Sequence, residues 1–141
     1  MDNLTYEQMH DENDIMIPKL KEIYRLPEVS RYLNISDNYF CYVTKTYGVY
    51  FYKVWNKDEL IGAIHLELNE NLLYMDILIF PKFQRKGFAT KVIDDIQNDI
   101  FKLNYFCFVC KLNFKTVTIY TEFDILTKRN LLFTRDNFRI V

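Results

Sequence analysis

The feature that most constrains the fold is an apolar segment at 72–80 that stops at Pro81 and resumes, through Gly87, as a helical pattern. Every residue of this segment is Leu, Ile, Tyr, Met or Phe except Asp76, which is typical of a strand buried on both faces. Proline has no N–H to donate to a strand ladder, so the strand should end there. Further along, apolar residues recur at helical spacing, at Val92, Ile93, Ile96 and Ile100. The sequence therefore predicts a strand that turns into a helix across residues 82–87.

A tight turn of this kind is suited to binding phosphate. The first turn of a helix carries unpaired backbone N–H groups and the positive end of the helix dipole, both of which attract phosphate oxygens. Gly87 allows a ligand to approach closely, Arg85 and Lys86 add positive charge, and the small side chain of Ala89 leaves the first turn open. An ordinary solvated helix start is the alternative, and these residues alone do not decide between the two.

Composition excludes several classes of protein. The chain has 141 residues, half of them hydrophobic and 17% aromatic, which predicts one well-buried domain over 1–141 rather than global disorder. The formal net charge is −1, without the basic surplus expected of a nucleic-acid binder. No apolar run is long enough to span a bilayer, and residues 1–14 contain acids and no apolar core of a secretory signal. We therefore expect neither a nucleic-acid partner nor a membrane.

The three cysteines favour a reduced, cytoplasmic protein. Cys107 and Cys110 lie within an apolar aromatic segment, where buried thiols are common. A Cys-x-x-Cys metal or redox site is the less favoured alternative, because the chain has no second pair and the motif lies in a strand pattern rather than at a helix start. We expect no metal.

Segments before the phosphate turn predict an antiparallel meander, because apolar runs rich in aromatic and β-branched residues alternate there with short polar turns. The segment after the long helix is apolar on both faces and should be an interior strand. The expected order is a strand at 4–9, helices at 15–24 and 28–33, strands at 48–55, 60–68 and 72–80, the long helix, and a strand at 105–111.

The loop motif Gln84-x-x-Gly87-x-Ala89, directly after a strand that ends in proline, resembles the acetyl-CoA pyrophosphate loop of the GNAT superfamily of N-acetyltransferases. The segment 58–64 is similar to a hairpin that recurs in GNAT sequences just upstream of that loop. The resemblance implies an α/β (α+β) fold, with a single mixed, mostly antiparallel central sheet that includes a β-bulge strand and has helices on both faces. The two early helices would form part of the acceptor pocket.

A second stretch extends the resemblance. In GNAT proteins a helix after the interior strand carries Asn, a small residue and Tyr at a fixed spacing, and Asn113, Thr116 and Tyr120 have that spacing. Asp124-Ile125 stands where the family has Gly-Phe, which is a departure from the pattern. A rival alignment that would use Phe133 in place of Tyr120 is rejected because it leaves too little chain for the closing hairpin, expected at 126–141.

The resemblance implies roles for particular residues. The backbone of Leu78 and Ile79, freed from pairing by a bulge, would bind the pantetheine arm and the thioester carbonyl, and Asn113 would contact the pantetheine. The Tyr120 hydroxyl would be the general acid at the sulfur, with a packed aromatic as the alternative. The pyrophosphate would be held by Gln84, Arg85, Lys86, Gly87, Phe88, Ala89 and Thr90.

The general base is open between His65 and Asp76, because an imidazole or carboxylate beside a cleft is where a base would be found. Glu67 is the weaker candidate, since it lies near a strand end where it can be simply solvated. A bound water is a further alternative.

These observations predict an acetyl-CoA-dependent N-acetyltransferase without a metal, acting on a primary amine of a small molecule, amino acid or peptide by direct attack in a ternary complex. The alternative is a non-catalytic acyl-CoA-binding or regulatory domain of the same fold. The identity of the amine is not determined by the sequence, and a homodimer is one open assembly state. The aromatic residues could line an acceptor pocket, although core packing is favoured, at Tyr39, Phe40, Tyr42, Tyr47, Tyr50 and Tyr52.

Overall fold

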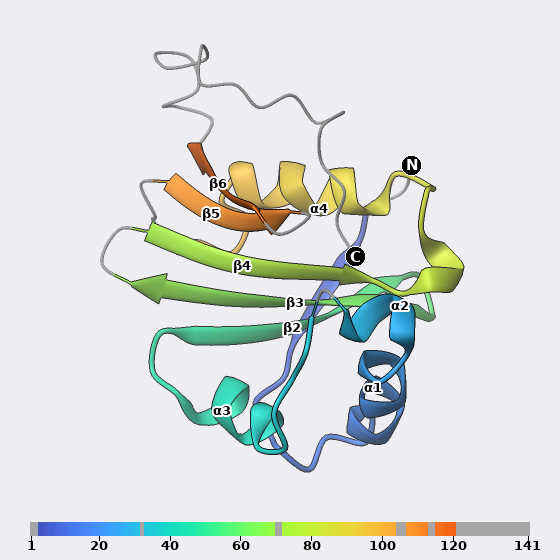
Figure 1. The fold of residues 1–141 in the computed structure, drawn as a ribbon. Coiled ribbons are helices and arrows are strands. Elements are labelled where there is room, and N and C mark those ends of the chain that lie inside the picture. Colours follow the sequence, from blue (N-terminus) through green and yellow to red (C-terminus); the bar gives the residue numbers. More distant parts are fainter. Residues whose placement is uncertain (1–2, 32, 70–71, 104–106, 113–114, 121–141) are drawn as a thin grey trace.

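A six-stranded sheet in the order β1-β2-β3-β4-β5-β6 runs through the molecule (Figure 1). The computed structural model describes residues 3–31, 33–69, 72–103, 107–112 and 115–120. Neighbouring strands are antiparallel except β4 and β5, which are parallel, so the predicted mixed and mostly antiparallel sheet is confirmed. The strands are β1 (Thr5–Gln8), β2 (Val49–Asn56), β3 (Glu59–Asn69), β4 (Leu72–Ile79), β5 (Cys107–Leu112) and β6 (Lys115–Tyr120).

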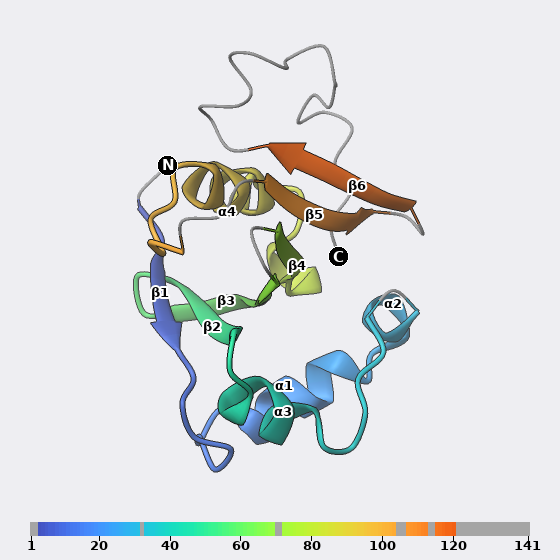
Figure 2. The same cartoon turned by 90° about the vertical axis from the view of Figure 1, so that its left-hand side faces the viewer.

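Helices cover both faces of the sheet, as predicted (Figures 1 and 2). Helix α4 packs on one face over one apolar cluster. Helices α1, α2 and α3 pack on the other face and share a second cluster. Helix α3 was not predicted by the sequence analysis, and the long helix is shorter than its apolar pattern, so that Ile100 is exposed beyond its end. The helices are α1 (Ile17–Tyr24), α2 (Pro27–Ser30), α3 (Tyr39–Lys45), the 3₁₀ turn η1 (Pro81–Phe83) and α4 (Phe88–Gln97).

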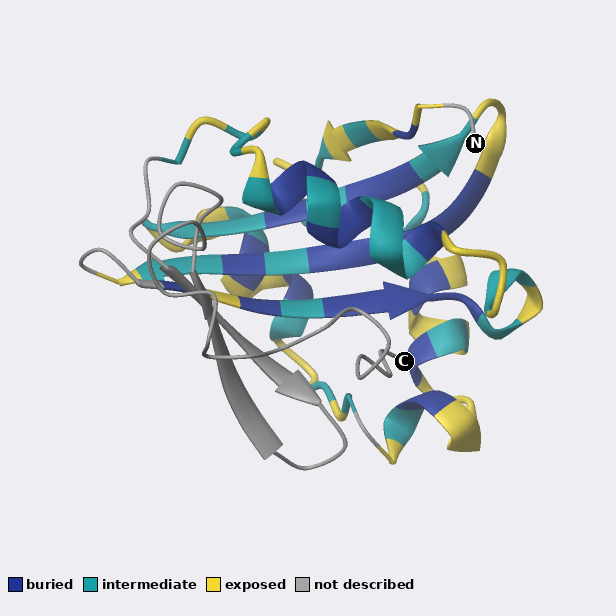
Figure 3. Cartoon of the chain, turned by 90° about the horizontal axis from the view of Figure 1, so that it is seen from above, coloured by how far each residue is buried: buried dark blue, intermediate teal, exposed yellow. Residues whose placement is uncertain are grey.

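Alternation along β4 divides its side chains between the two faces. Met75, Ile77 and Ile79 belong to the cluster under α4, whereas Leu78 belongs to the cluster under α1, α2 and α3. Figure 3 shows the buried residues running along the central strands beneath α4. Because β4 is covered on both sides, its near-continuous apolar sequence is explained by burial on two faces.

The predicted bulge exists, but it lies in β3 and not in β4. Val54 pairs with Gly62 and Trp55 pairs with Leu60, so Ile61 is the extra residue in β3. The register between β3 and β4 is unbroken from the Gly62–Ile79 pair to the Asn69–Leu72 pair. The expectation of a bulge at Leu78 and Ile79 is therefore wrong, and the twist that a bulge introduces enters the sheet one strand earlier.

Gly62 lies where β3 and β4 approach most closely beside this bulge. A Cβ added at Gly62 would be 2.3 Å from the backbone oxygen of Leu78 and 3.3 Å from the Cα of Ile79. Backbone atoms cannot rotate away as a side-chain end can, so only glycine fits without moving β4.

We expect Gly62→Ala to destabilise the fold by about 1–3 kcal/mol or more, the usual cost of overpacking a well-packed site. Urea unfolding measures the difference from the wild-type protein. Lys19→Ala, at an exposed position on α1, is the control and should stay within about 0.5 kcal/mol. An equal effect of the two substitutions would show that β4 can move away from β3 at little cost.

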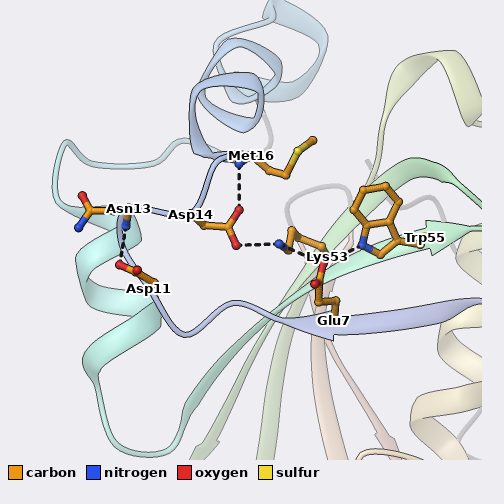
Figure 4. A network of polar contacts seen from close by, with 7 residues as sticks. All are labelled: Glu7, Asp11, Asn13, Asp14, Met16, Lys53 and Trp55. Carbon is orange, nitrogen blue, oxygen red and sulfur yellow. Dashed lines mark hydrogen bonds and ion pairs between the residues drawn. The ribbon is translucent and has the colours of Figure 1, made fainter.

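A buried lysine fixes the start of α1 against β2 (Figure 4). The Lys53 side chain is 6% exposed, and its Nζ lies 2.7 Å from Asp14 Oδ2 and 3.0 Å from Glu7 Oε1. The other oxygen of Asp14 accepts the backbone N–H of Met16 at 2.9 Å, next to the first residue of α1. Trp55 Nε1 donates to Glu7 at 3.1 Å. This network holds β1, β2 and the segment before α1 together.

The network predicts a pH-dependent part of the stability. Burial raises the pKa of the Asp14 carboxyl, but the Lys53 ammonium and the Met16 N–H lower it by more, so the net pKa lies below the ordinary value. A group whose pKa is lower in the folded state stabilises the fold above its unfolded pKa, about 3.9 for Asp, and loses this contribution as pH falls through the folded pKa. Asp14→Asn should cost about 1.5–3 kcal/mol at pH 7, the value of a hydrogen bond to a charged group. The cost should shrink below pH 4.

Urea unfolding of both proteins at neutral pH and at about pH 3 measures this change. Asp58→Asn, at an exposed position in the turn between β2 and β3, is the matched control. A constant difference between wild type and Asp14→Asn at both pH values would contradict the ion-pair interpretation.

The helix predicted to begin at Asn113 and to carry Tyr120 is wrong, because residues 115–120 form β6, paired antiparallel with β5. The physical reason is local composition. β-Branched side chains have restricted rotamers in a helix and pack well on a sheet, and four of them are consecutive at Thr116, Val117, Thr118 and Ile119. Asn113 and the expected hairpin at 126–141 lie outside the described residues.

Candidate active site

The second half of β4 is paired on one side only within the described part of the chain. Strand β5 pairs with Leu72–Met75 and no further, and Figure 1 shows it alongside the first half of β4. The N–H of Phe80 donates to the oxygen of Ile61 at 2.9 Å. Because hydrogen-bonding direction alternates along an antiparallel pair, the peptide groups of Ile77 and Ile79 point toward the β5 side.

This geometry corrects one predicted contact and adds another. The Leu78 backbone, expected to be free for a ligand, faces β3, and its oxygen lies against Gly62. The peptide group of Ile79 faces the β5 side, and its predicted contact with the pantetheine arm stays a prediction. Ile77 was missed, although the period of two along a strand would have identified it from Ile79.

The loop after β4 places the residues that were predicted to bind phosphate next to the end of β4 at Ile79. Gly87 has φ 88° and precedes the first residue of α4, and no side chain caps that helix start. Arg85 also has a positive φ, 63°. The Gln84 side chain turns back, and its Nε2 donates to the oxygen of Ile79 at 2.8 Å. Gln84 therefore holds the loop to the end of β4 by its side chain.

A chain of polar side chains lies on the opposite face, under α1 and α3. His65 on β3 is the register partner of Asp76 on β4. The Nδ1 atom of His65 is 2.8 Å from the Tyr39 hydroxyl, and its Nε2 is 2.8 Å from Glu67 Oε1. The Tyr42 hydroxyl donates to the same Glu67 oxygen at 2.7 Å. The two predicted base candidates are thus neighbours, and Glu67, expected to be the weaker candidate, is hydrogen-bonded to one of them.

Two tyrosines extend this group of hydrogen-bonded side chains toward the interior. Tyr24, the last residue of α1, is hydrogen-bonded to Tyr39, the first residue of α3. Burial raises the pKa of both hydroxyls, and the nearby Asp76 carboxylate raises them further, so both remain protonated near neutral pH. The sequence analysis did not assign Tyr24 or Tyr39 to the site. Their contacts join segments far apart in the chain, and no local pattern reports such contacts.

Tyr120 lies elsewhere along the sheet. It pairs with Cys107, which pairs in turn with Leu72, at the end of β4 opposite to Ile79. Ile79 is seven positions after Leu72 along β4, roughly 23 Å at the usual rise per residue. The position expected of Tyr120, beside the end of β4, depended on the helix that the structure replaces with β6.

Comparison with known proteins decides the family. The profile of the Acetyltransferase (GNAT) family matches residues 10–124, which covers most of the chain and includes β4, the loop and α4. The chain belongs to the GNAT acetyltransferase family. No curated protein sequence matches this GNAT protein significantly.

Solved structures share the fold at low sequence identity. Spermidine N-acetyltransferase from Vibrio cholerae, in complex with CoA and spermine, is 18% identical, with 76% of this chain and 69% of that chain covered and a TM-score of 0.63. Aminoglycoside acetyltransferase AAC(6')-Ib, in complex with coenzyme A, is 12% identical, with 90% and 99% covered and a TM-score of 0.68. N-acetylglutamate synthase from Neisseria gonorrhoeae, in complex with coenzyme A and N-acetyl-glutamate, is 15% identical, with 78% of this chain and 25% of that chain covered and a TM-score of 0.59. At these identities the likeness supports the fold alone.

The residues present fit acetyl-CoA. The uncapped start of α4 at Gly87 offers N–H groups to phosphate. The outward peptide group of Ile77 and the N–H of Ile79 offer donors and an acceptor to an amide-containing arm, while the Ile79 oxygen already accepts from Gln84. Within the described ranges, no three His, Cys, Asp or Glu side chains gather as metal ligands. The described helices include none that is long and apolar enough to cross a membrane.

The register makes a prediction for Tyr120. Because the backbone register places Tyr120 beside the end of β4 opposite to Ile79, we expect Tyr120→Phe to leave kcat within about twofold of wild type. Steady-state kinetics with acetyl-CoA and a working amine measures this. A fall in kcat by about 100-fold with unchanged affinity for CoA would restore Tyr120 as the general acid.

Proposed function

We propose that this GNAT protein transfers the acetyl group of acetyl-CoA to a primary amine by direct attack within a ternary complex. The observation that carries the proposal is the position of Asp76, the first residue of β4 beyond its pairing with β5. The open peptide edge begins there on one side of the strand, and the polar chain that includes His65 lies on the face toward α1 and α3.

The cofactor half of the site rests on backbone groups. The N–H groups of the first turn of α4, at Phe88, Ala89 and Thr90, would hold the pyrophosphate, with Arg85 and Lys86 adding positive charge. The peptide groups of Ile77 and Ile79 would bind the pantetheine arm. Asn113 stays a proposed contact to the pantetheine. Acetyl-CoA supplies the activated thioester, so this chain needs only to hold it and to manage protons.

The proposed binding of the acceptor amine depends on negatively charged side chains. Asp76 and Glu67 are carboxylates on the face beneath α1 and α3, and the hydroxyls of Tyr24, Tyr39 and Tyr42 surround them. An amine arrives as an ammonium ion, which a carboxylate attracts strongly in a partly desolvated site. The proposed acceptor is therefore a primary amine of a small molecule, amino acid or peptide.

Thiol release tests this function directly. The full chain is incubated with acetyl-CoA and, in separate reactions, with spermine, ribostamycin and glutamate, and free CoA and the acetylated amine are both quantified. Amine-dependent release of CoA matched by N-acetyl product supports the proposal. Stabilisation of the fold by acetyl-CoA without turnover on any amine would favour a non-catalytic acyl-CoA-binding domain.

Substitution of Gly87 tests whether the loop before α4 binds CoA. Gly87→Ala places a Cβ at a φ of 88°, which strains the turn and moves the first N–H groups of α4. We expect CoA binding to weaken by at least about tenfold, the loss of one charge-assisted hydrogen bond. Calorimetry measures the affinity. Arg85→Ala and Lys86→Ala should each cost less, because exposed charges are screened by salt.

Gly48→Ala is the matched control, because Gly48 also has a positive φ, 80°, in the turn that leads into β2. It should lower stability without changing CoA affinity. Equal weakening by Gly48→Ala and Gly87→Ala would mean that global destabilisation, and not the loop, explains the loss.

A further inference from the structure

The hydrogen bonds that link Tyr39, His65 and Glu67 under α1 and α3 have defined donors and acceptors. A carboxylate only accepts hydrogen bonds, so the contact between His65 Nε2 and Glu67 requires that Nε2 carries the proton when the imidazole is neutral. The Nδ1 atom is then an acceptor, and the Tyr39 hydroxyl 2.8 Å away donates to it. A carboxylate behind one ring nitrogen fixes the tautomer and the orientation of the ring. The nitrogen of His65 that can accept a proton therefore faces Tyr39.

Tyr39 lies between this base and the interior of the site. Its hydroxyl donates its single proton to Nδ1 of His65 when the imidazole is neutral, so the Tyr39 oxygen is left with acceptor positions only. Asp76 is the register partner of His65 on the neighbouring strand, and His65 contacts the Tyr39 hydroxyl, so an ammonium ion held by Asp76 would lie on the same face of the sheet as the Tyr39 oxygen.

Among the described residues, three further neighbours of His65 can be placed around its ring. On the sheet it is flanked by Phe51 on β2 and by Asp76 on β4. The ring of Tyr42 lies on α3 with its centroid 6.2 Å from the imidazole, and its hydroxyl is bonded to Glu67. His65 is 11% exposed at the side chain, so the bulk solvent reaches it mainly through Glu67, which is 36% exposed.

We propose that Tyr39 is a catalytic proton shuttle between the acceptor ammonium and a base formed by His65 and Glu67. This inference rests on the proposed acetyl transfer. The ammonium N–H bond breaks and its proton passes to the Tyr39 oxygen, while the original Tyr39 proton passes to Nδ1 of His65, which becomes an imidazolium ion paired with Glu67. The neutral amine then forms a bond to the acetyl carbon, the carbon–sulfur bond breaks, and the second amine proton ends on the thiolate. After the product leaves, the same path runs in reverse: Nδ1 of His65 returns its proton to the Tyr39 oxygen while Tyr39 gives its proton to solvent in the vacated acceptor site, which restores the Nε2–H tautomer.

The shuttle also fits the protonation state of Tyr39. Burial is the main cause of the raised pKa of Tyr39. An isolated tyrosinate is therefore unfavourable at this position, which favours a transfer in which the oxygen gains one proton as it loses the other. Glu67 acts as a positioning residue, since its hydrogen bond with Nε2 orients the imidazole.

Tyr39→Phe is the decisive variant, because it keeps the ring that packs against Phe40 and Phe51 and removes only the hydroxyl. We expect kcat/KM for the fastest amine of the panel to fall by about 100-fold or more, with CoA affinity unchanged. Tyr52→Phe is the matched control, because Tyr52 packs on the other face of the sheet against Phe101. It should retain wild-type activity. A loss of less than about threefold in Tyr39→Phe would overturn the shuttle.

A second measurement does not depend on turnover. The chain has two histidines, so His10→Gln leaves His65 as the single imidazole for ¹⁵N NMR of the full chain. The neutral ring should be the Nε2–H tautomer, and Tyr39→Phe should shift the Nδ1 resonance. An Nδ1–H tautomer would overturn the shuttle even in an active enzyme. A wild-type protein without turnover on any amine would overturn acetyl transfer and the shuttle together, and the NMR result would then report only whether the hydrogen-bonded chain exists.

Discussion

Strand β4 pairs with β3 along its whole length but with β5 along only its first half. The rest of the candidate site depends on this difference in pairing. A buried peptide group without a partner is costly, so an open strand edge in a folded protein calls for a ligand or another segment to satisfy it. The peptide groups of Ile77 and Ile79 lie beyond Met75, the last residue of β4 that pairs with β5, and the loop with Gly87 follows after η1. In the proposed site, donors and acceptors for an extended cofactor would therefore come from the backbone, whose positions the sheet fixes.

The close contact between β3 and β4 makes this edge rigid. The bulge at Ile61 changes the pairing with β2, yet the pairing with β4 continues without a shift because Gly62 has no Cβ to separate the two strands. A larger residue would push β4 away at the point where its outward groups are needed. The Gln84 side chain adds a second restraint by bonding the Ile79 oxygen. The geometry of the open edge is thus determined by contacts on its closed side.

Much of this arrangement was predictable from the sequence because it is local. The meander of β2, β3 and β4 follows from alternation and polar turns, and the phosphate turn follows from Pro81 and Gly87. Predictions that rested on the resemblance at 113–120 were less reliable, since the β-branched run there favours a strand. Helix α3 was missed because its aromatic residues suit a strand as well as a helix. The contacts of Tyr24 and Tyr39 with the sheet could not be predicted, because they depend on how α1 and α3 pack.

Charge is segregated by the same architecture. Lys82, Arg85 and Lys86 lie in the loop that precedes α4, and Lys82 and Lys86 both lie over the ring of Phe83. The carboxylates of Glu67 and Asp76 lie on the face covered by α1 and α3. In the proposed site, a polyanionic cofactor would be attracted to the loop and a cationic amine to the carboxylates on the face covered by α1 and α3. Alternation of side chains along β4 would then separate the two proposed binding sites, while its backbone would join them at the half of the strand that β5 does not pair.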